Sequence, residues 1–194
     1  MSIFDEIVRA YQEPGRHYHN LDHINALLTL SATHAAMLRD RDAVDLAIFF
    51  HDVVYDAARS DNEIASAKFA RNRLARLGRP MVEIAMIAHW IEMSKHGRAQ
   101  AAPTDTDLAH FLDFDLSILA AERSLYQTYA QAIRREYALY PDPLYQKGRR
   151  EVLLAFLAKP VIYRTPHLRD AWEAAARANM AWEASTLGPC NSRN

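Results

Sequence analysis

The sequence predicts an all-α fold, a single compact helical bundle, on three observations. Apolar residues recur at spacings of three and four along nearly the whole chain, which is the period of a helix face. Only five glycines and eight prolines interrupt the 194 residues. A hydrophobic content of 50% supplies one sizeable core, and the chain is short for two. We therefore expect one domain over residues 1–187 and a frayed tail at residues 188–194.

Residues that start or stop helices mark several of the expected elements. Gly78 follows an apolar run as a C-terminal stop, and Pro80 suits the first turn of the next helix. Asp61 precedes an acidic first turn at Glu63. The span Gly97–Thr104 is the one loose loop that we expect. In chain order, the expected helices are Ser2–Gln12, Asn20–Leu38, Arg41–Tyr55, Asp61–Leu77, Pro80–Met93, Asp105–Ala120, Glu122–Leu139, Pro143–Leu157 and Thr165–Ser185.

Charge and cysteine content exclude several classes of protein. With 23 basic and 24 acidic residues, the net charge of -1 gives no basic field for a long nucleic acid or a membrane surface. The single cysteine, Cys190, excludes an intrachain disulfide framework and a Cys-rich zinc site. Charged residues interrupt the opening stretch MSIFDEIVRAYQE, so neither a signal peptide nor a membrane span is visible. We expect a cytoplasmic enzyme or regulator that binds a small ligand, and a homodimer stays open.

The third expected helix holds an imidazole and a carboxylate in an apolar stretch. In AIFFHDVVYD, His51 and Asp52 are adjacent, and an unpaired carboxylate in a core costs several kcal/mol or becomes neutral. Neighbouring helical residues point about 100° apart, so the two side chains can reach one ion from both flanks. His23 lies on the apolar stripe of the preceding helix. A hydrogen-bonded core histidine would explain His23 alone, but the neighbouring doublet favours a metal ion.

Helical geometry selects a fourth ligand in DTDLAHFLDFDLSILA. Asp115 falls within the apolar stripe, whereas Asp113, two residues earlier, is about 200° away on the other face. Asp115 is therefore the expected inward acid, and Asp113 is expected to be solvated or to act through a ligand. The two-nitrogen, two-oxygen set of His23, His51, Asp52 and Asp115 suits manganese, iron, cobalt, nickel or zinc better than calcium, and it leaves positions open to water.

At these residues the sequence resembles the HD-domain superfamily of metal-dependent phosphohydrolases. It is most similar to a bacterial branch known as predicted metal-dependent HD phosphohydrolases. The resemblance covers about Tyr11 to Glu183 and implies an HD-domain helical fold with the same four ligand positions. It implies no particular substrate. The fragments that carry it are RHYHNLDHI, FFHDVVYD with DNEIAS, FLDFDLSIL, IRREY and ARANMAWE.

The activity that this resemblance implies is phosphoester hydrolysis by a metal-activated water. The expected cofactor is one divalent ion or two, drawn from manganese, cobalt, nickel, zinc, iron or magnesium. The expected substrate is a small phosphorylated molecule, with a nucleotide first by analogy. Proton transfer has two candidates besides the ligand Asp52. Asp56 is equally typical of a helix-end turn, and Glu63 is equally typical of the third residue of a capped helix. The resemblance favours Glu63.

Five other residues are candidates for binding the substrate phosphate. Arg16 precedes His23 closely enough to reach the same pocket as a bidentate clamp, although an ordinary loop arginine is the alternative. His19 shares the face of His23 if the helix starts early enough. The segment SKHG is similar to a family segment, which places Lys95 and His96 near phosphate. Arg134 is expected at the pocket mouth.

Two further functions stay open at this stage. A di-iron HD oxygenase needs two more histidine ligands between Asp52 and Asp115, and the available ones are spaced poorly. The second of these functions is that of a non-catalytic, metal-containing module that senses a ligand. A structural metal has a closed coordination shell, whereas catalysis requires exchangeable water on the ion.

Overall fold

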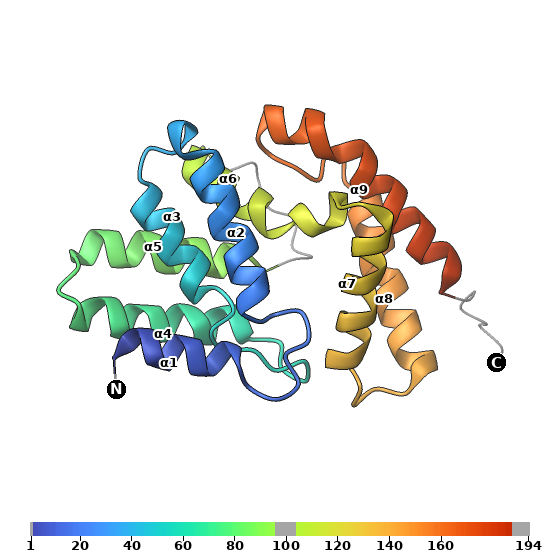
Figure 1. The fold of residues 1–194 in the computed structure, drawn as a ribbon, viewed down its shortest axis with the longest axis horizontal. Helices are drawn as coiled ribbons and strands as arrows, with labels where there is room; N and C mark the ends of the chain where they lie inside the picture. Colours follow the sequence, from blue (N-terminus) through green and yellow to red (C-terminus); the bar gives the residue numbers. More distant parts are fainter. Residues whose placement is uncertain (1, 96–103, 188–194) are drawn as a thin grey trace. The chain divides into compact units, whose positions relative to one another are not determined.

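Helices account for all the regular secondary structure in the described residues, 2–95 and 104–187, of the computed structural model (Figure 1). The all-α prediction is thus confirmed. The α-helices are α1 (Ile3–Tyr11), α2 (Leu21–Thr33), α3 (Arg41–Phe50), α4 (Asn62–Arg76), α5 (Met81–Met93), α6 (Thr106–Asp115), α7 (Arg123–Glu136), α8 (Asp142–Leu157) and α9 (Pro166–Thr186). Two short 3-10 helices, η1 (Ala35–Met37) and η2 (Ser117–Ala120), follow α2 and α6.

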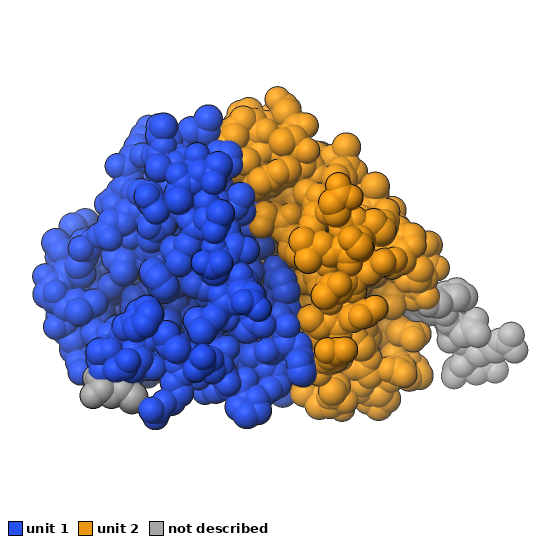
Figure 2. Space-filling model, in the orientation of Figure 1, with its two compact units in different colours: residues 1–115 blue, residues 116–194 orange. Residues whose placement is uncertain are grey.

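The chain divides into two compact units, which Figure 2 colours separately. Unit 1, Met1–Asp115, contains α1 to α6, and unit 2, Leu116–Asn194, contains α7 to α9. Each described unit has its own buried apolar residues. The expectation of a single domain stays a prediction. None of the helices in the described ranges combines the length and the hydropathy that crossing a membrane requires.

Side-chain caps fix where the helices of unit 1 begin. Ser2 and Asp5 form a reciprocal capping box at the start of α1. Asn20 caps α2, so that His23 lies in the first turn of that helix. Asp40 caps α3 through the backbone amide of Ala43 at 3.0 Å. These caps satisfy amides that have no partner inside a helix and set the start of each element.

A glycine stop joins α4 and α5 into a hairpin (Figure 1). Gly78 has φ +72°, the left-handed conformation that ends helices, and its amide donates to Ala75 at 3.0 Å. The predicted stop at this position is confirmed. Pro80 then occupies the N-cap of α5.

Helix α6 is buried on all sides, from Asp107 through Phe114. It packs against both α2 and α3. The buried Asp107 carboxylate accepts from the backbone amides of Arg39 and Asp40, at 3.0 and 2.8 Å. This contact ties the start of α6 to the start of α3 and holds the core of unit 1 together.

Three helices end five residues earlier than the sequence pattern predicts. Helix α2 ends at Thr33 and α6 at Asp115, and each gives way to a 3-10 turn. Helix α3 ends at Phe50, five residues before the expected end at Tyr55, so the His51–Asp52 doublet lies at and beyond its C-terminus. The expected loop at Gly97–Thr104 falls almost wholly outside the described residues, as does the expected tail.

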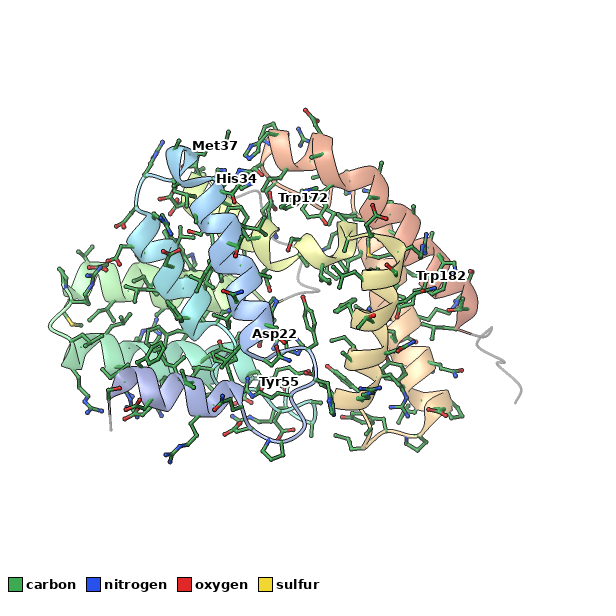
Figure 3. The ribbon with its side chains drawn as sticks, in the orientation of Figure 1. Asp22, His34, Met37, Tyr55, Trp172 and Trp182 are labelled. Carbon is green, nitrogen blue, oxygen red and sulfur yellow. The ribbon has the colours of Figure 1, made fainter. Side chains whose placement is uncertain are left out.

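Unit 2 is built around α9, which carries Trp172 and Trp182 (Figure 3). Trp172 meets the buried Tyr163 edge to face, with ring centroids 5.4 Å apart. The buried Asn179 amide donates to the carbonyls of Leu119 and Ala121, at 2.9 and 2.8 Å. These contacts fasten α9 to the segment around η2.

Candidate metal centre

The end of α3 determines how His51 is presented. Its backbone amide donates to Ala47 at 2.9 Å and closes the last turn of the helix. Its Nδ1 lies 2.8 Å from the carbonyl oxygen of Ile48, which makes Nδ1 the donor of that hydrogen bond. Metal-ligating histidines commonly use one ring nitrogen in this way. The contact therefore directs Nε2 of His51 towards the neighbouring ligand candidates.

The Nε2 atom of His51 is the centre of a cluster of four side chains from unit 1. It lies 3.3 Å from Nε2 of His23, 3.0 Å from Oδ2 of Asp52 and 3.5 Å from Oδ1 of Asp115. The same Asp115 oxygen is 3.4 Å from Nε2 of His23. Helices α2 and α6 and the end of α3 thus bring a second nitrogen and two oxygens around Nε2 of His51.

These separations match the donor spacing of a metal site. Ligands about 2.0–2.2 Å from an ion in a tetrahedral site are about 3.3–3.6 Å from one another. His23, His51 and Asp52 offer ligand atoms that all lie within 4.8 Å of one another, and this group could hold a metal ion. It is the one such group within residues 2–95 and 104–187. The donor set therefore fits a metal ion.

Burial differs around the cluster and leaves one side accessible to solvent. The side chains of His23 and His51 are 2% and 1% exposed, and that of Asp115 is 8% exposed. Asp52 is 14% exposed, and His19, whose Nε2 lies 3.9 Å from Oδ2 of Asp52, is 19% exposed. Water or a ligand would therefore reach the cluster from the Asp52 side.

The electrostatics of the cluster favour a positive charge beside Asp52. Burial opposes the imidazolium form of His51, but the carboxylates of Asp52 and Asp115 outweigh it and raise the pKa of His51 well above its ordinary value. Burial also opposes ionisation of Asp52, but His51 and His19 outweigh it and lower the Asp52 pKa. Burial lowers the pKa of His23. The two carboxylates therefore favour a positive charge next to Nε2 of His51, as a bound cation would supply.

Aromatic rings line the accessible side of the cluster. The ring of His19 stacks on Tyr55, with centroids 4.1 Å apart, and Tyr55 belongs to the segment that follows α3 (Figure 3). Tyr18 lies against His23 at 4.8 Å. His19 precedes the N-cap residue Asn20, so it is not part of α2 as the sequence analysis required, yet it reaches Asp52. The structure thus brings His19 to the site by a different route.

Arg16 lies beside the cluster, but its guanidinium is used within the fold. Its Nη1 donates to the Asp52 carbonyl at 2.6 Å, and its Nη2 donates to the Val53 carbonyl at 2.9 Å. The side chain is only 3% exposed. These contacts favour the structural alternative over the expected phosphate clamp, because both Nη groups already bind backbone oxygens, and only the buried Nε has no hydrogen-bond partner.

Lys95 and Glu63 come together where α4 begins and α5 has just ended. Their charged groups lie 3.7 Å apart, and the Lys95 ammonium also donates to the carbonyl of Ser60. Asp56 has a turn role, since its carboxylate accepts from the amide of Ala58 at 2.8 Å. Of the two expected proton carriers, Glu63 is therefore less committed to local backbone.

The remaining predicted substrate residues have different outcomes. Arg134 belongs to unit 2, where it donates to the carbonyls of Tyr137 and Tyr140, at 2.8 and 3.0 Å, and pairs with Asp142 at 2.6 Å. These contacts secure the end of α7, and the expected place of Arg134 at a pocket mouth stays a prediction. His96 lies outside the described residues.

The burial of Asp113 differs from the prediction made from the sequence. It was expected to be solvated or to act through a ligand, and solvation is wrong because the residue is fully buried. The face argument assumed an amphipathic helix, whereas α6 is buried all round. The expected contacts of Asp115 with His23 and His51 are present.

Tyr11 is a site residue that the sequence analysis missed. Its hydroxyl accepts from the amide of Asp52 at 3.3 Å and donates to the carbonyl of Phe49 at 3.1 Å. The only signal in the sequence is a tyrosine on the apolar face of α1, a position that usually indicates packing alone.

Comparisons with known proteins identify no relative. No family model matches the sequence, and no curated protein or solved structure is similar to the chain.

Proposed function

We propose that this chain is a metal-dependent phosphohydrolase that cleaves a phosphoester of a small phosphorylated molecule, with nucleotides as the first class to test. The observation that carries the proposal is the convergence of His23, His51, Asp52 and Asp115, of which Asp52 is the most exposed, at 14%. The resemblance of these segments to HD-domain phosphohydrolases adds support.

The four side chains would hold the ion as two imidazole and two carboxylate ligands. When bound, the ion would lower the pKa of a water molecule and stabilise negative charge on a phosphoryl oxygen. His19 stands beside Asp52 as a polar group at the accessible side, suited to a hydrogen bond with a phosphoryl oxygen. Its stacking on Tyr55 fixes the plane of that ring.

Two charged residues complete the proposed machinery. Lys95 would supply a cation for the substrate phosphate, and Glu63 beside it would carry the proton. Replacing Glu63 with glutamine should lower kcat strongly and change KM little. The metal content of the protein should stay unchanged. Asp56→Asn, which alters only a turn carboxylate, is the matched comparison. An equal fall in kcat for both variants would remove the special role of Glu63.

The activity is tested by phosphate release from a panel of nucleotides and sugar phosphates. The full chain is assayed with added manganese, cobalt, nickel, zinc, iron or magnesium, beside Asp52→Asn and a unit 2 control, Asp142→Asn. We expect release that depends on the metal, is lost in Asp52→Asn and is retained in Asp142→Asn. Tight metal binding without turnover on any substrate would contradict hydrolysis and favour the ligand-sensing module. Two irons per chain without phosphate release would favour the oxygenase.

A further inference from the structure

The two Nη groups of Arg16 donate hydrogen bonds to the backbone around Asp52, a proposed metal ligand. We call this pair of contacts the fork of Arg16. Its Nη1 donates to the carbonyls of Asp52 and His19, at 2.6 and 3.3 Å, and its Nη2 donates to that of Val53 at 2.9 Å. Nη2 also lies 3.5 Å from the Glu13 carboxylate. The guanidinium therefore connects the segment before α2 with the segment after α3.

The carbonyls that Arg16 binds have left the helix and need donors from elsewhere. Helix α3 ends at Phe50, so the oxygens of Asp52 and Val53 have no place in its hydrogen-bond ladder. A planar guanidinium presents several N–H groups in fixed directions, which a lysine ammonium does not. The fork thus fixes the orientation of this backbone, and not only its position.

The aromatic rings of Tyr11 and Tyr55 lie against the guanidinium of Arg16. The Cζ atom of Arg16 lies 5.2 Å from the ring centroid of Tyr11 and 5.7 Å from that of Tyr55. The hydroxyl of Tyr11 bonds the carbonyl of Phe49 and the amide of Asp52. Both Arg16 and Tyr11 therefore form hydrogen bonds with the backbone at the end of α3 and in the turn that follows it.

We propose that Arg16 is a positioning residue for the metal centre, which orients the carboxylate of Asp52 and the imidazole of His51 through the backbone that it binds. This proposal rests on the metal centre of the proposed function. It replaces the direct contact with phosphate that the sequence suggested, because the Nη groups already bind backbone oxygens.

Unit 2 offers a matched control in Arg177. This residue donates to the carbonyls of Leu157 and Lys159 at the end of α8, at 2.9 and 2.8 Å, and pairs with Glu173. It therefore makes the same kind of fork after a helix, with a carboxylate partner, on a unit without proposed metal ligands. Its side chain is 31% exposed, against 3% for Arg16.

The experiment measures zinc and cobalt affinity in the metal-stripped full chain by titration calorimetry. The variants are Arg16→Lys, Arg16→Met and Arg177→Lys, each checked for helicity by circular dichroism. We expect Arg16→Lys to bind metal at least about tenfold more weakly, as removal of the outer support of a metal ligand does. The absorption spectrum of its cobalt form should also shift. Arg177→Lys should match the wild type in both readouts.

The outcomes separate this inference from the proposed function. If the wild type binds no metal, the metal centre itself is wrong and the role of Arg16 falls with it. If the wild type binds and Arg16→Lys binds equally well, only the positioning role is overturned. Unchanged metal affinity together with weakened binding of inorganic phosphate to the metal-loaded variant would restore the phosphate clamp. Loss of helicity in Arg16→Lys would assign Arg16 to stability of the fold and would also overturn the proposal. If only Arg16→Met unfolds, the lysine variant decides.

Discussion

Nε2 of His51 lies 3.0 Å from Oδ2 of Asp52 although the two residues are neighbours in the chain. In a continuous helix their side chains would diverge by about 100°. The backbone instead leaves α3 at this point, His51 serves as the C-cap, and Asp52 lies in the following turn. The end of a helix, rather than the face of one, brings the doublet to a single site.

Replacing Asp52 with asparagine should abolish tight metal binding without unfolding the chain. Loss of an outer partner alone lowers metal affinity by about 10–100-fold, so loss of a ligand should cost more than about 100-fold. Calorimetric titration with zinc measures this effect, and circular dichroism checks the helices. Asp22→Asn serves as the control, because Asp22 lies one residue from His23 and outside the cluster. Wild-type affinity in Asp52→Asn would contradict the assignment.

Substitutions of Asp113 and Asp115 should have different effects on the stability of the fold and on metal binding. Asp115→Asn removes a carboxylate that contacts both imidazoles, so zinc affinity should fall, which Asp113→Asn should not cause. Asp113 is fully buried, so Asp113→Asn should lower the free energy of unfolding by about 1–3 kcal/mol, as altering a buried polar group does. Urea denaturation and zinc titration of both variants test this contrast. The reverse pattern would show that the inward acid was chosen wrongly.

The ion pair between Arg149 and Glu183 should be important for the stability of unit 2. Its side chains are 11% and 5% exposed, and Nε of Arg149 lies 2.8 Å from Glu183. Arg149→Met should cost about 3–5 kcal/mol, because it leaves a buried carboxylate without its positively charged partner. The exposed Arg71–Glu92 pair is the comparison, and Arg71→Met should cost less than about 1 kcal/mol. Equal costs in urea denaturation would contradict this account.

Tyr126 should make stability fall at alkaline pH. Burial and the Glu183 charge raise its pKa above the ordinary value of 10.0, and its hydroxyl donates to Glu183 at 2.6 Å. The unfolded chain loses this proton near pH 10 while the folded chain keeps it. The stabilisation is therefore complete below that pH and declines as the pH rises towards the folded pKa.

Tyr126→Phe tests the alkaline effect directly. The free energy of unfolding of this variant should fall less steeply than that of the wild type between about pH 9 and pH 11. Tyr145, whose pKa is raised to about 12, titrates in both proteins and cancels in the comparison. Parallel pH profiles in urea denaturation would show that Tyr126 does not carry the effect.

The fold class and the cluster of His23, His51 and Asp52 could be predicted from the sequence. Helical periodicity indicated the helices, and the carboxylate of Asp52 within an apolar stretch indicated a partner for its charge. The positions of His23 and His51 among apolar residues indicated partners for these side chains in the same way, because buried polar groups need compensation. These arguments need only the period of a helix and the cost of burial.

Other features depend on tertiary structure and could not be predicted. Helix α3 ends early, and Arg16 binds the Asp52 carbonyl beyond that end, across 36 positions of sequence. The burial of Asp113 follows from the central place of α6, where no face is left for solvent. The contacts of Arg134 with the carbonyls of Tyr137 and Tyr140 depend on how the chain turns after α7. Hydrogen bonds between distant segments leave no periodic signal.

The most direct test of the account is X-ray absorption spectroscopy of zinc bound to the purified full chain, with elemental analysis of the same sample. The account predicts about one ion per chain, with imidazole nitrogens and carboxylate oxygens about 2.0–2.2 Å from it. The same measurement on Asp52→Asn should show that the ion is lost. A sulfur ligand, no retained metal, or an unchanged spectrum in Asp52→Asn would contradict the metal centre at His23, His51, Asp52 and Asp115.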